Sequence, residues 1–191
     1  MISGAVRDEL IARYGEPHRR YHTMAHIEDC LAQVAASIDL TGDQRELLEA
    51  AIWFHDAIYD PTRGDNEAES ARLARERLTA AGAPEPFIDE VERLILLTAG
   101  HSVEPDDRLG ARLVSIDLSI LGAEPERYDA YAAAIREEYA HVPEPAYRAG
   151  RAAIMGRFLE SDRLFADPVW AMRYETRARA NIRREIGALT A

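Results

Sequence analysis

The stretch LLEAAIWFHDAIYD, residues 47–60, decides the fold class. Its apolar side chains recur at intervals of three and four residues, which is the spacing of one helix face rather than the alternation of a β-strand. The run VERLILLTAG at residues 91–100 repeats this spacing, and little sustained alternation occurs elsewhere. The sequence therefore predicts an all-α protein.

Residues that start and stop helices agree with this prediction. Thr41 and Gln44 have the spacing of a capping box, as do Asn66 and Glu69, and Gly82 is expected to end the helix that follows Asn66. Prolines suited to a first helical turn occur at Pro84 or Pro86, Pro125, Pro145 and Pro168. We expect helices at roughly residues 2–14, 23–38, 43–59, 66–81, 85–99, 109–121, 125–140, 144–160 and 168–187.

Length and composition suit one domain over residues 1–191, with 47% hydrophobic and 30% charged side chains. Lys and Arg total 23 against 34 Asp and Glu, which gives a net charge of −11. This charge argues against nucleic acid or an anionic membrane surface as the main partner. A small anionic substrate remains compatible, because a metal ion or a few arginines can invert the sign of the local charge.

The sequence also predicts a cytoplasmic protein without a membrane span. Cys30 is the one cysteine, so an internal disulfide is excluded and an oxidising compartment is not indicated. No segment approaches the roughly 18 consecutive apolar residues of a membrane helix. Arg7, Asp8 and Glu9 stand where a signal peptide needs its apolar region.

The segment YHTMAH holds the first pair of candidate functional residues, His22 and His26. Residues four apart share one face if the helix already runs there. If Thr23 is the N-cap, His22 instead lies just outside the helix entrance. The pair lacks the glutamate of H-E-x-x-H, which excludes a zinc-protease motif.

Ionisable residues also stand inside two apolar runs: the adjacent His55 and Asp56, and Asp117 in LVSIDLSIL. Burying such groups is costly unless they are paired or bound to a metal ion. The structural alternatives are a His55–Asp56 hydrogen bond that joins two helices, and an Asp117 carboxylate that caps a helix or pairs with an arginine.

Together, two imidazoles and two carboxylates would make a coherent site for a divalent ion; they are His26, His55, Asp56 and Asp117. Four ligands leave octahedral positions for water and substrate. The mixed nitrogen and oxygen set suits Mn, Fe, Co, Ni or Zn better than Mg or Ca. Adjacent helical residues point about 100° apart, so an ion between His55 and Asp56 needs its other ligands from separate helices, as at the centre of a bundle.

The order His…His-Asp…Asp resembles the HD superfamily of metal-dependent phosphohydrolases. The segments YH-x-x-x-H, WFHDAIYDP, NEAESA, TAGH and DLSILG are similar to a bacterial group known as predicted HD phosphohydrolases, and the resemblance covers about residues 21–117. It implies a single-domain helical bundle of the HD type. It also implies that the metal ligands are His26, His55, Asp56 and Asp117.

The motif YH-x-x-x-H is also similar to that of cyclic-nucleotide phosphodiesterases, in which the first histidine protonates the leaving oxygen. Carried over, this role falls to His22, although Thr23 replaces the asparagine of the phosphodiesterase motif. HD enzymes with two metals supply two further histidines before the last aspartate, and here only His101 lies in that interval. One metal ion is therefore expected unless Glu67 or Asp60 supplies another ligand.

Four further residues are candidates for supporting roles. His101 would orient the substrate or bind a second ion, or act only as a cation favoured at a helix C-terminus. Glu67 would activate or orient the attacking water, or only complement the helix dipole. Arg19 and Arg20 would contact a substrate phosphate, because a guanidinium binds phosphate bidentately, or would be plain solvated charges.

These observations predict a hydrolase that acts on a phosphomonoester, phosphodiester or phosphoanhydride of a nucleotide-like small molecule. It would use one divalent transition metal, a metal-activated water and no organic cofactor. One alternative is an HD-fold di-iron oxygenase, which needs more ligands. Another is a non-catalytic, metal-stabilised nucleotide-binding or regulatory module whose water positions are closed by protein groups.

Overall fold

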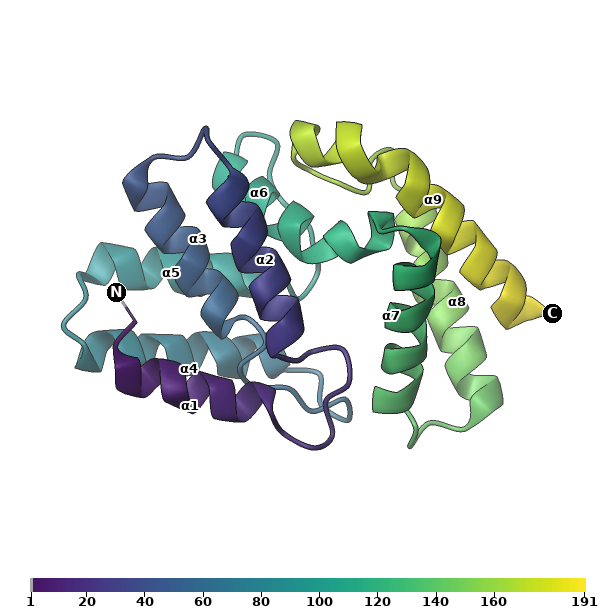
Figure 1. Ribbon diagram of the computed structural model, residues 1–191, viewed down its shortest axis with the longest axis horizontal. Coiled ribbons are helices and arrows are strands. Elements are labelled where there is room, and N and C mark those ends of the chain that lie inside the picture. Colours follow the sequence, from purple (N-terminus) through teal and green to yellow (C-terminus); the bar gives the residue numbers. More distant parts are fainter. Residues whose placement is uncertain (1) are drawn as a thin grey trace. The chain divides into compact units, whose positions relative to one another are not determined.

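The computed structural model describes residues 2–191, which form α-helices and one 3₁₀ helix without any strand (Figure 1). The prediction of an all-α protein is confirmed. Contacts divide the chain into two compact units, one that ends at Leu113 and one that begins at Val114. The boundary falls inside one helix, and the expectation of a single domain stays a prediction. Among residues 2–191, no helix has the length and apolar character needed to cross a membrane.

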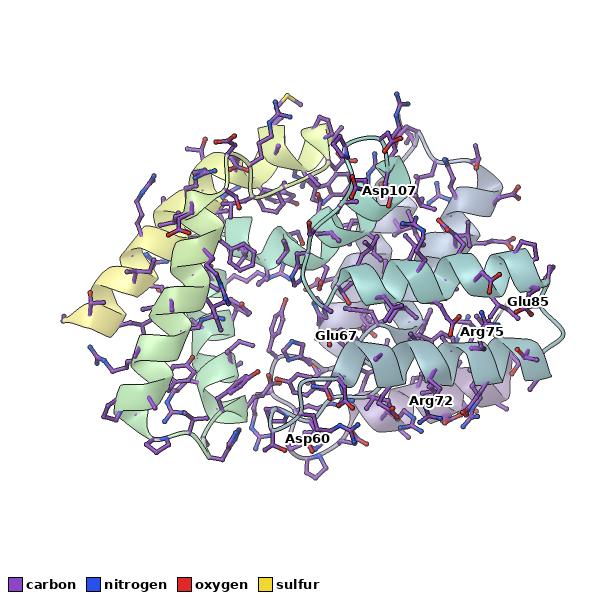
Figure 2. All side chains as sticks on the ribbon, turned by 180° about the vertical axis from the view of Figure 1, so that it is seen from behind. Asp60, Glu67, Arg72, Arg75, Glu85 and Asp107 are labelled. Carbon is purple, nitrogen blue, oxygen red and sulfur yellow. The ribbon has the colours of Figure 1, made fainter. Side chains whose placement is uncertain are left out.

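The first unit is built around α3, which packs against α2, α4 and α5, while α4 packs along α5. The helices of this unit are α1 (Gly4–Tyr14), α2 (Met24–Ala36), α3 (Gly42–Phe54), α4 (Asn66–Ala80), α5 (Glu85–Leu97) and the start of α6 (Arg108–Asp117). Ion pairs line the contact of α4 with α5; Figure 2 shows Arg75 and Glu85, which form one of them.

Most helix signals in the sequence are confirmed. The backbone N–H of Gln44 donates to Thr41 Oγ1 at 3.2 Å, and that of Thr41 donates to Gln44 Oε1 at 3.0 Å, so the capping box exists. Gly82 has φ +72° just after α4, as a C-terminal glycine does. The prolines lie in first helical turns at Pro86, Pro125, Pro145 and Pro168.

Two local predictions are wrong. Asp65, not Asn66, is the N-cap of α4, and the Asn66 side chain bonds to the backbone of Asp60 instead of forming a capping box. Helix α3 ends at Phe54, before the predicted end at residue 59, and His55 is its C-cap. The HD doublet therefore lies at the end of a helix and not inside one.

Helix α6 starts in the first unit, where Asp107 Oδ1 accepts a hydrogen bond from the Gly110 N–H at 2.9 Å. A Cβ at Gly110 would lie 2.6 Å from Leu97 Cδ1 and closer still to the Asp107 carboxylate, so a larger residue here would require both side chains to move. Buried Arg112 binds Asp39, beyond α2, through hydrogen bonds of 3.1 and 2.8 Å. These contacts fix the beginning of α6 within the first unit.

The second unit consists of the end of α6, the 3₁₀ helix η1 (Leu118–Gly122), α7 (Pro125–Glu138), α8 (Glu144–Glu160) and α9 (Pro168–Thr190). Helix α9 packs against η1 and α8, and η1 packs against α7. Buried Arg151 donates from Nε to Glu185 Oε1 at 2.9 Å, and the Tyr128 hydroxyl donates to the other carboxylate oxygen. This polar cluster joins α7, α8 and α9.

Glu9 connects α1 to α4 through an ion pair, and because of this pair we expect the stability of the protein to fall at low pH. Arg77 donates from Nε and Nη2 to the Glu9 carboxylate at 2.7 and 3.0 Å, and Arg13 Nη2 donates to it at 3.1 Å. The hydrogen bonds from Arg77, aided by those from Arg13, lower the pKa of Glu9 to about 2 against the opposing effect of burial. The folded-state pKa therefore lies below the unfolded value of 4.5.

Stability from this pair is present above pH 4.5 and is lost as the pH falls from there through about 2. We expect Glu9→Gln to lower the free energy of unfolding at pH 7 by about 1 kcal/mol and to flatten its decline below pH 4.5. Urea unfolding across this range measures both effects, with exposed Asp8→Asn as the neighbouring control. Equal pH profiles for the two variants would contradict the prediction.

Candidate metal centre

Three of the four predicted ligands meet within the first unit. His26 lies in the first turn of α2, His55 caps α3, and Asp56 follows it. His26 Nε2 is 3.3 Å from His55 Nε2, and Asp56 Oδ2 is 3.1 Å from His55 Nε2 and 3.6 Å from His26 Nε2. Three potential ligand atoms, from two separate segments of the chain, therefore face a common point.

The surroundings of the two histidines direct Nε2 of each ring toward that point. His55 Nδ1 is 2.9 Å from the Ile52 carbonyl oxygen, which can only accept, so the Nδ1 of a neutral His55 carries the proton and Nε2 presents its lone pair. His26 Nδ1 is 3.1 Å from the Tyr21 hydroxyl, which can hold that ring in the same way. Tyr21 is a supporting residue that the sequence did not reveal.

Asp56 is ionised in this setting. Burial alone would raise the pKa of its carboxyl group, but the positive charges that His55, His22 and His26 carry when protonated, together with the hydrogen bond from His55, hold that pKa below its ordinary value. Both histidines are buried, with exposed fractions of 5% for His26 and 2% for His55. Two buried imidazoles and an ionised carboxylate are suitable ligands for a divalent transition metal.

A histidine and aspartate cluster that includes His26 and His55 could therefore hold a metal ion. The fourth predicted ligand, Asp117, is the last residue of α6 and is half-buried in the second unit. Its role as a ligand stays a prediction.

His22 lies immediately before α2, whose N-cap is Thr23, in agreement with one of the two positions that the sequence allowed. Its ring stacks on Tyr59, with the ring centroids 4.2 Å apart and an angle of 29° between the planes. The His22 ring is also edge-on to His26 at 6.2 Å. Tyr59 thus holds His22 beside the cluster, and the proton-donor role stays a prediction.

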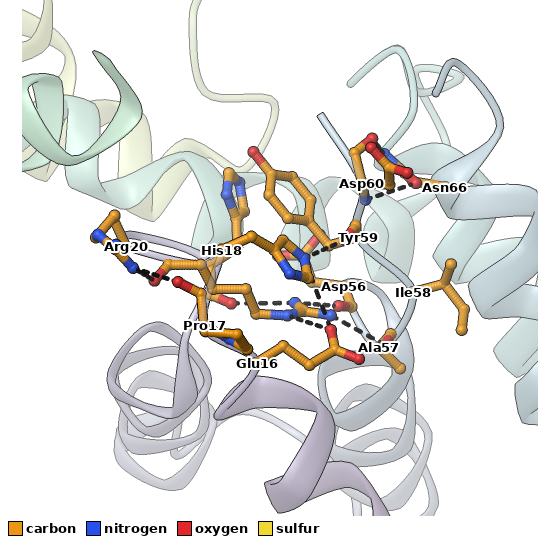
Figure 3. Close-up of polar contacts among 12 residues, drawn as sticks. Glu16, Pro17, His18, Arg20, Asp56, Ala57, Ile58, Tyr59, Asp60 and Asn66 are labelled. Carbon is orange, nitrogen blue, oxygen red and sulfur yellow. Dashed lines mark hydrogen bonds and ion pairs between the residues drawn. The ribbon is translucent and has the colours of Figure 1, made fainter. Parts of the chain in front are cut away.

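The sequence did not reveal the side chains that hold the backbone after the HD doublet. Each carbonyl from residue 56 to residue 60 bonds to a side chain of another segment; Figure 3 shows several of these contacts. The pairs are Arg19 Nη1 with Asp56 at 2.7 Å, Arg19 Nη2 with Ala57 at 3.1 Å, Ser70 Oγ with Ile58 at 3.3 Å, His18 Nε2 with Tyr59 at 2.7 Å, and Asn66 Nδ2 with Asp60 at 2.9 Å.

Asn66 and Ser70 are four residues apart, so both project from one face of α4. Besides donating to carbonyls, Asn66 Oδ1 accepts from the Asp60 N–H at 3.1 Å, and Ser70 Oγ accepts from the Ile58 N–H at 3.0 Å. Because these side chains satisfy the loop's backbone groups, α3 has no need to continue past Phe54. The signal was the polar pair at helical spacing within NEAESA.

The structure places the other candidates around the first unit. Glu67 lies in the first turn of α4, where an acidic side chain also complements the helix dipole. Asp60, in the loop before α4 (Figure 2), accepts hydrogen bonds from the Thr62 N–H and hydroxyl at 2.8 and 2.7 Å. His101 follows α5 with φ +52°, and its N–H donates to the Leu97 carbonyl at 2.9 Å. The predicted roles of these residues stay predictions.

The two arginines before Tyr21 differ from each other. Arg20 is exposed and donates to the carbonyls of Pro17 and Arg19, and its contact with a phosphate stays a prediction. The Arg19 side chain has no solvent exposure, and its guanidinium points at main-chain carbonyls. This burial differs from the expectation that Arg19 contacts a substrate phosphate or is a solvated charge.

No protein-family model, curated protein or solved structure matches this chain. The functional argument therefore rests on the motifs in the sequence and on the geometry of the cluster.

Proposed function

We propose that the chain is an HD-type, metal-dependent phosphohydrolase that acts on a phosphoester or phosphoanhydride of a nucleotide-like small molecule. The observation that carries the proposal is the convergence of His26 Nε2, His55 Nε2 and Asp56 Oδ2 at separations of 3.1–3.6 Å. Asp117 is the proposed fourth ligand, by the resemblance of the order His…His-Asp…Asp to the HD superfamily.

A divalent ion bound to these ligands would supply a Lewis acid for a phosphoryl oxygen and lower the pKa of a water molecule. His26 and His55 supply neutral nitrogen donors, and the ionised Asp56 balances part of the positive charge. His22, stacked on Tyr59 beside the cluster, would donate a proton to the leaving oxygen. Glu67 would orient the attacking water, and His101 and exposed Arg20 would contact the substrate.

A small phosphorylated substrate fits the charge of the chain better than a nucleic acid does. A nucleic acid carries negative charge along its whole length, so the net charge of −11 on the protein repels it. A single phosphate group needs only a local region of positive potential, which a divalent ion creates within the cluster.

The test is a turnover screen on protein loaded separately with Mn, Co, Ni, Zn and Mg. Phosphate or nitrophenolate release is measured from nitrophenyl phosphate, bis-nitrophenyl phosphate, nucleotides and other phosphorylated metabolites, and metal content is measured by mass spectrometry. We expect about one ion per chain and turnover that disappears with a chelator. A protein that binds no divalent ion, or that binds one tightly without turning over any phosphorylated compound, would contradict the proposal. Tight nucleotide binding in the second case would support a regulatory module.

A second candidate is an HD-fold iron oxygenase, because two histidines and one carboxylate also form a common ligand set for non-haem iron. A di-iron centre would need ligands beyond His26, His55, Asp56 and Asp117. Oxygen consumption after loading with ferrous iron, together with the absorption of a mixed-valent iron pair, would favour this activity over phosphate release.

A further inference from the structure

Arg19 is the most completely buried cation near the cluster, with no exposure of its side chain. It lies in the segment between α1 and α2, and its guanidinium bonds to both segments that carry the candidate site. Nη1 donates to the His22 carbonyl at 3.1 Å and to the Asp56 carbonyl at 2.7 Å, while Nη2 donates to the Ala57 carbonyl at 3.1 Å. Nε donates to Glu16 Oε2 at 3.1 Å, and Figure 3 shows Glu16, Asp56 and Ala57.

Two aromatic rings also contact this guanidinium, in addition to its hydrogen bonds. Arg19 Cζ lies 5.2 Å from the ring centroid of Tyr14 and 5.4 Å from that of Tyr59. Tyr59 stacks in turn on His22. A lysine ammonium could not replace this arrangement, because it is a point charge without the planar fork that reaches several carbonyls at fixed angles.

We propose that Arg19 is a positioning residue that sets the separation between the backbone at His22 and the backbone at Asp56. The proposal rests on the metal centre proposed above. By bonding to both carbonyls at once, one side chain holds the start of α2 against the end of α3. The ligands on these helices then need little rearrangement when an ion binds, so less of the binding free energy is spent on ordering them.

The test compares Arg19→Lys with a matched control, Arg45→Lys. Arg45 also joins two helices by donating to carbonyls, those of Val34 and Ser37, but it does so at the opposite end of α2 from His26. Titration with Mn²⁺ or Co²⁺ gives the metal Kd of each variant, and thermal unfolding of the metal-free proteins gives their stability.

We expect both substitutions to lower the Tm of the metal-free protein, but only Arg19→Lys to weaken metal binding, by about tenfold or more. Hydrogen exchange of the metal-free protein gives a second measure, because amides of residues 55–60 should exchange faster in Arg19→Lys than in Arg45→Lys. A purely structural arginine would change the Tm and leave the metal Kd at the wild-type value, and that result would overturn the proposal.

If Arg19→Lys does not fold, Glu16→Ala decides the question, because it removes the half-exposed partner of Arg19 Nε; that carboxylate also lies 3.7 Å from His18 Nε2, so His18→Ala is the control. A metal Kd weakened by a few-fold in Glu16→Ala supports the proposal, and an unchanged Kd overturns it. A wild-type protein that binds no divalent ion would overturn the proposed function together with this role. An unchanged Kd in Arg19→Lys would overturn the role of Arg19 alone.

Discussion

His26→Ala and Asp56→Ala proteins are expected to lose their bound divalent ion and all metal-dependent turnover. Each substitution removes one of the three proposed ligand atoms, which the first unit brings within 3.1–3.6 Å of one another. The metal content should fall from about one ion per chain to nearly none, and the rise in Tm that the ion gives to the wild-type protein should disappear with it. Mass spectrometry of dialysed protein and thermal unfolding with and without metal measure these effects.

The matched control is His141→Ala, because His141 is exposed in the loop between α7 and α8 and is not one of the proposed ligands. This variant should retain wild-type metal content, metal-dependent Tm and turnover. Retention of both metal and activity by Asp56→Ala would show that the ligand assignment is wrong.

His22→Ala should fail in a different way, with nearly normal metal content and stability but a turnover lowered by about 10²–10⁴-fold, the usual cost of a lost general acid. The ring of His22 stacks on Tyr59 and lies 6.2 Å from the ring of His26, beside the ligands rather than among them. This position suits the proposed role of a proton donor, which does not require His22 to bind the ion.

Leaving-group dependence separates proton donation from a general loss of structure. Nitrophenolate leaves without protonation, so His22→Ala should lose much less activity on a nitrophenyl ester than on an alkyl or nucleoside ester. A variant that loses the metal as His26→Ala does would instead make His22 a ligand, and the proton donor would then have to be sought elsewhere, first at His101.

Short-range signals predicted the helices of this chain well. The capping box of Thr41 with Gln44 and the first-turn prolines depend only on neighbouring residues, and the structure contains both. The convergence of His26 with His55 and Asp56 was also predictable, because burying His55 and Asp56 is costly without partners and the order His…His-Asp…Asp resembles the HD ligand set.

The remaining features depend on contacts between distant residues. Apolar spacing continues through Tyr59, so periodicity alone could not show that α3 ends at Phe54. That end depends on Arg19, Asn66 and Ser70, which lie far from it in the sequence. The sequence predicts a phosphate contact or a surface charge at Arg19, because nothing beside it in the sequence indicates that three carbonyls surround its guanidinium.

The stretch from residue 56 to residue 60 is held by its carbonyls, and this creates an unequal tolerance to substitution. Every amino acid carries a backbone carbonyl, so an exchange at half-exposed Ile58 leaves the acceptors in place. The donors are less tolerant of substitution, because each donor group belongs to a side chain and is lost when that residue is replaced. They are the guanidinium of Arg19, the amide of Asn66 and the hydroxyl of Ser70. Protein engineers who wish to alter this loop should therefore vary Ile58, retain Asp56 and Tyr59, which contact His55 and His22, and keep the distant donors constant.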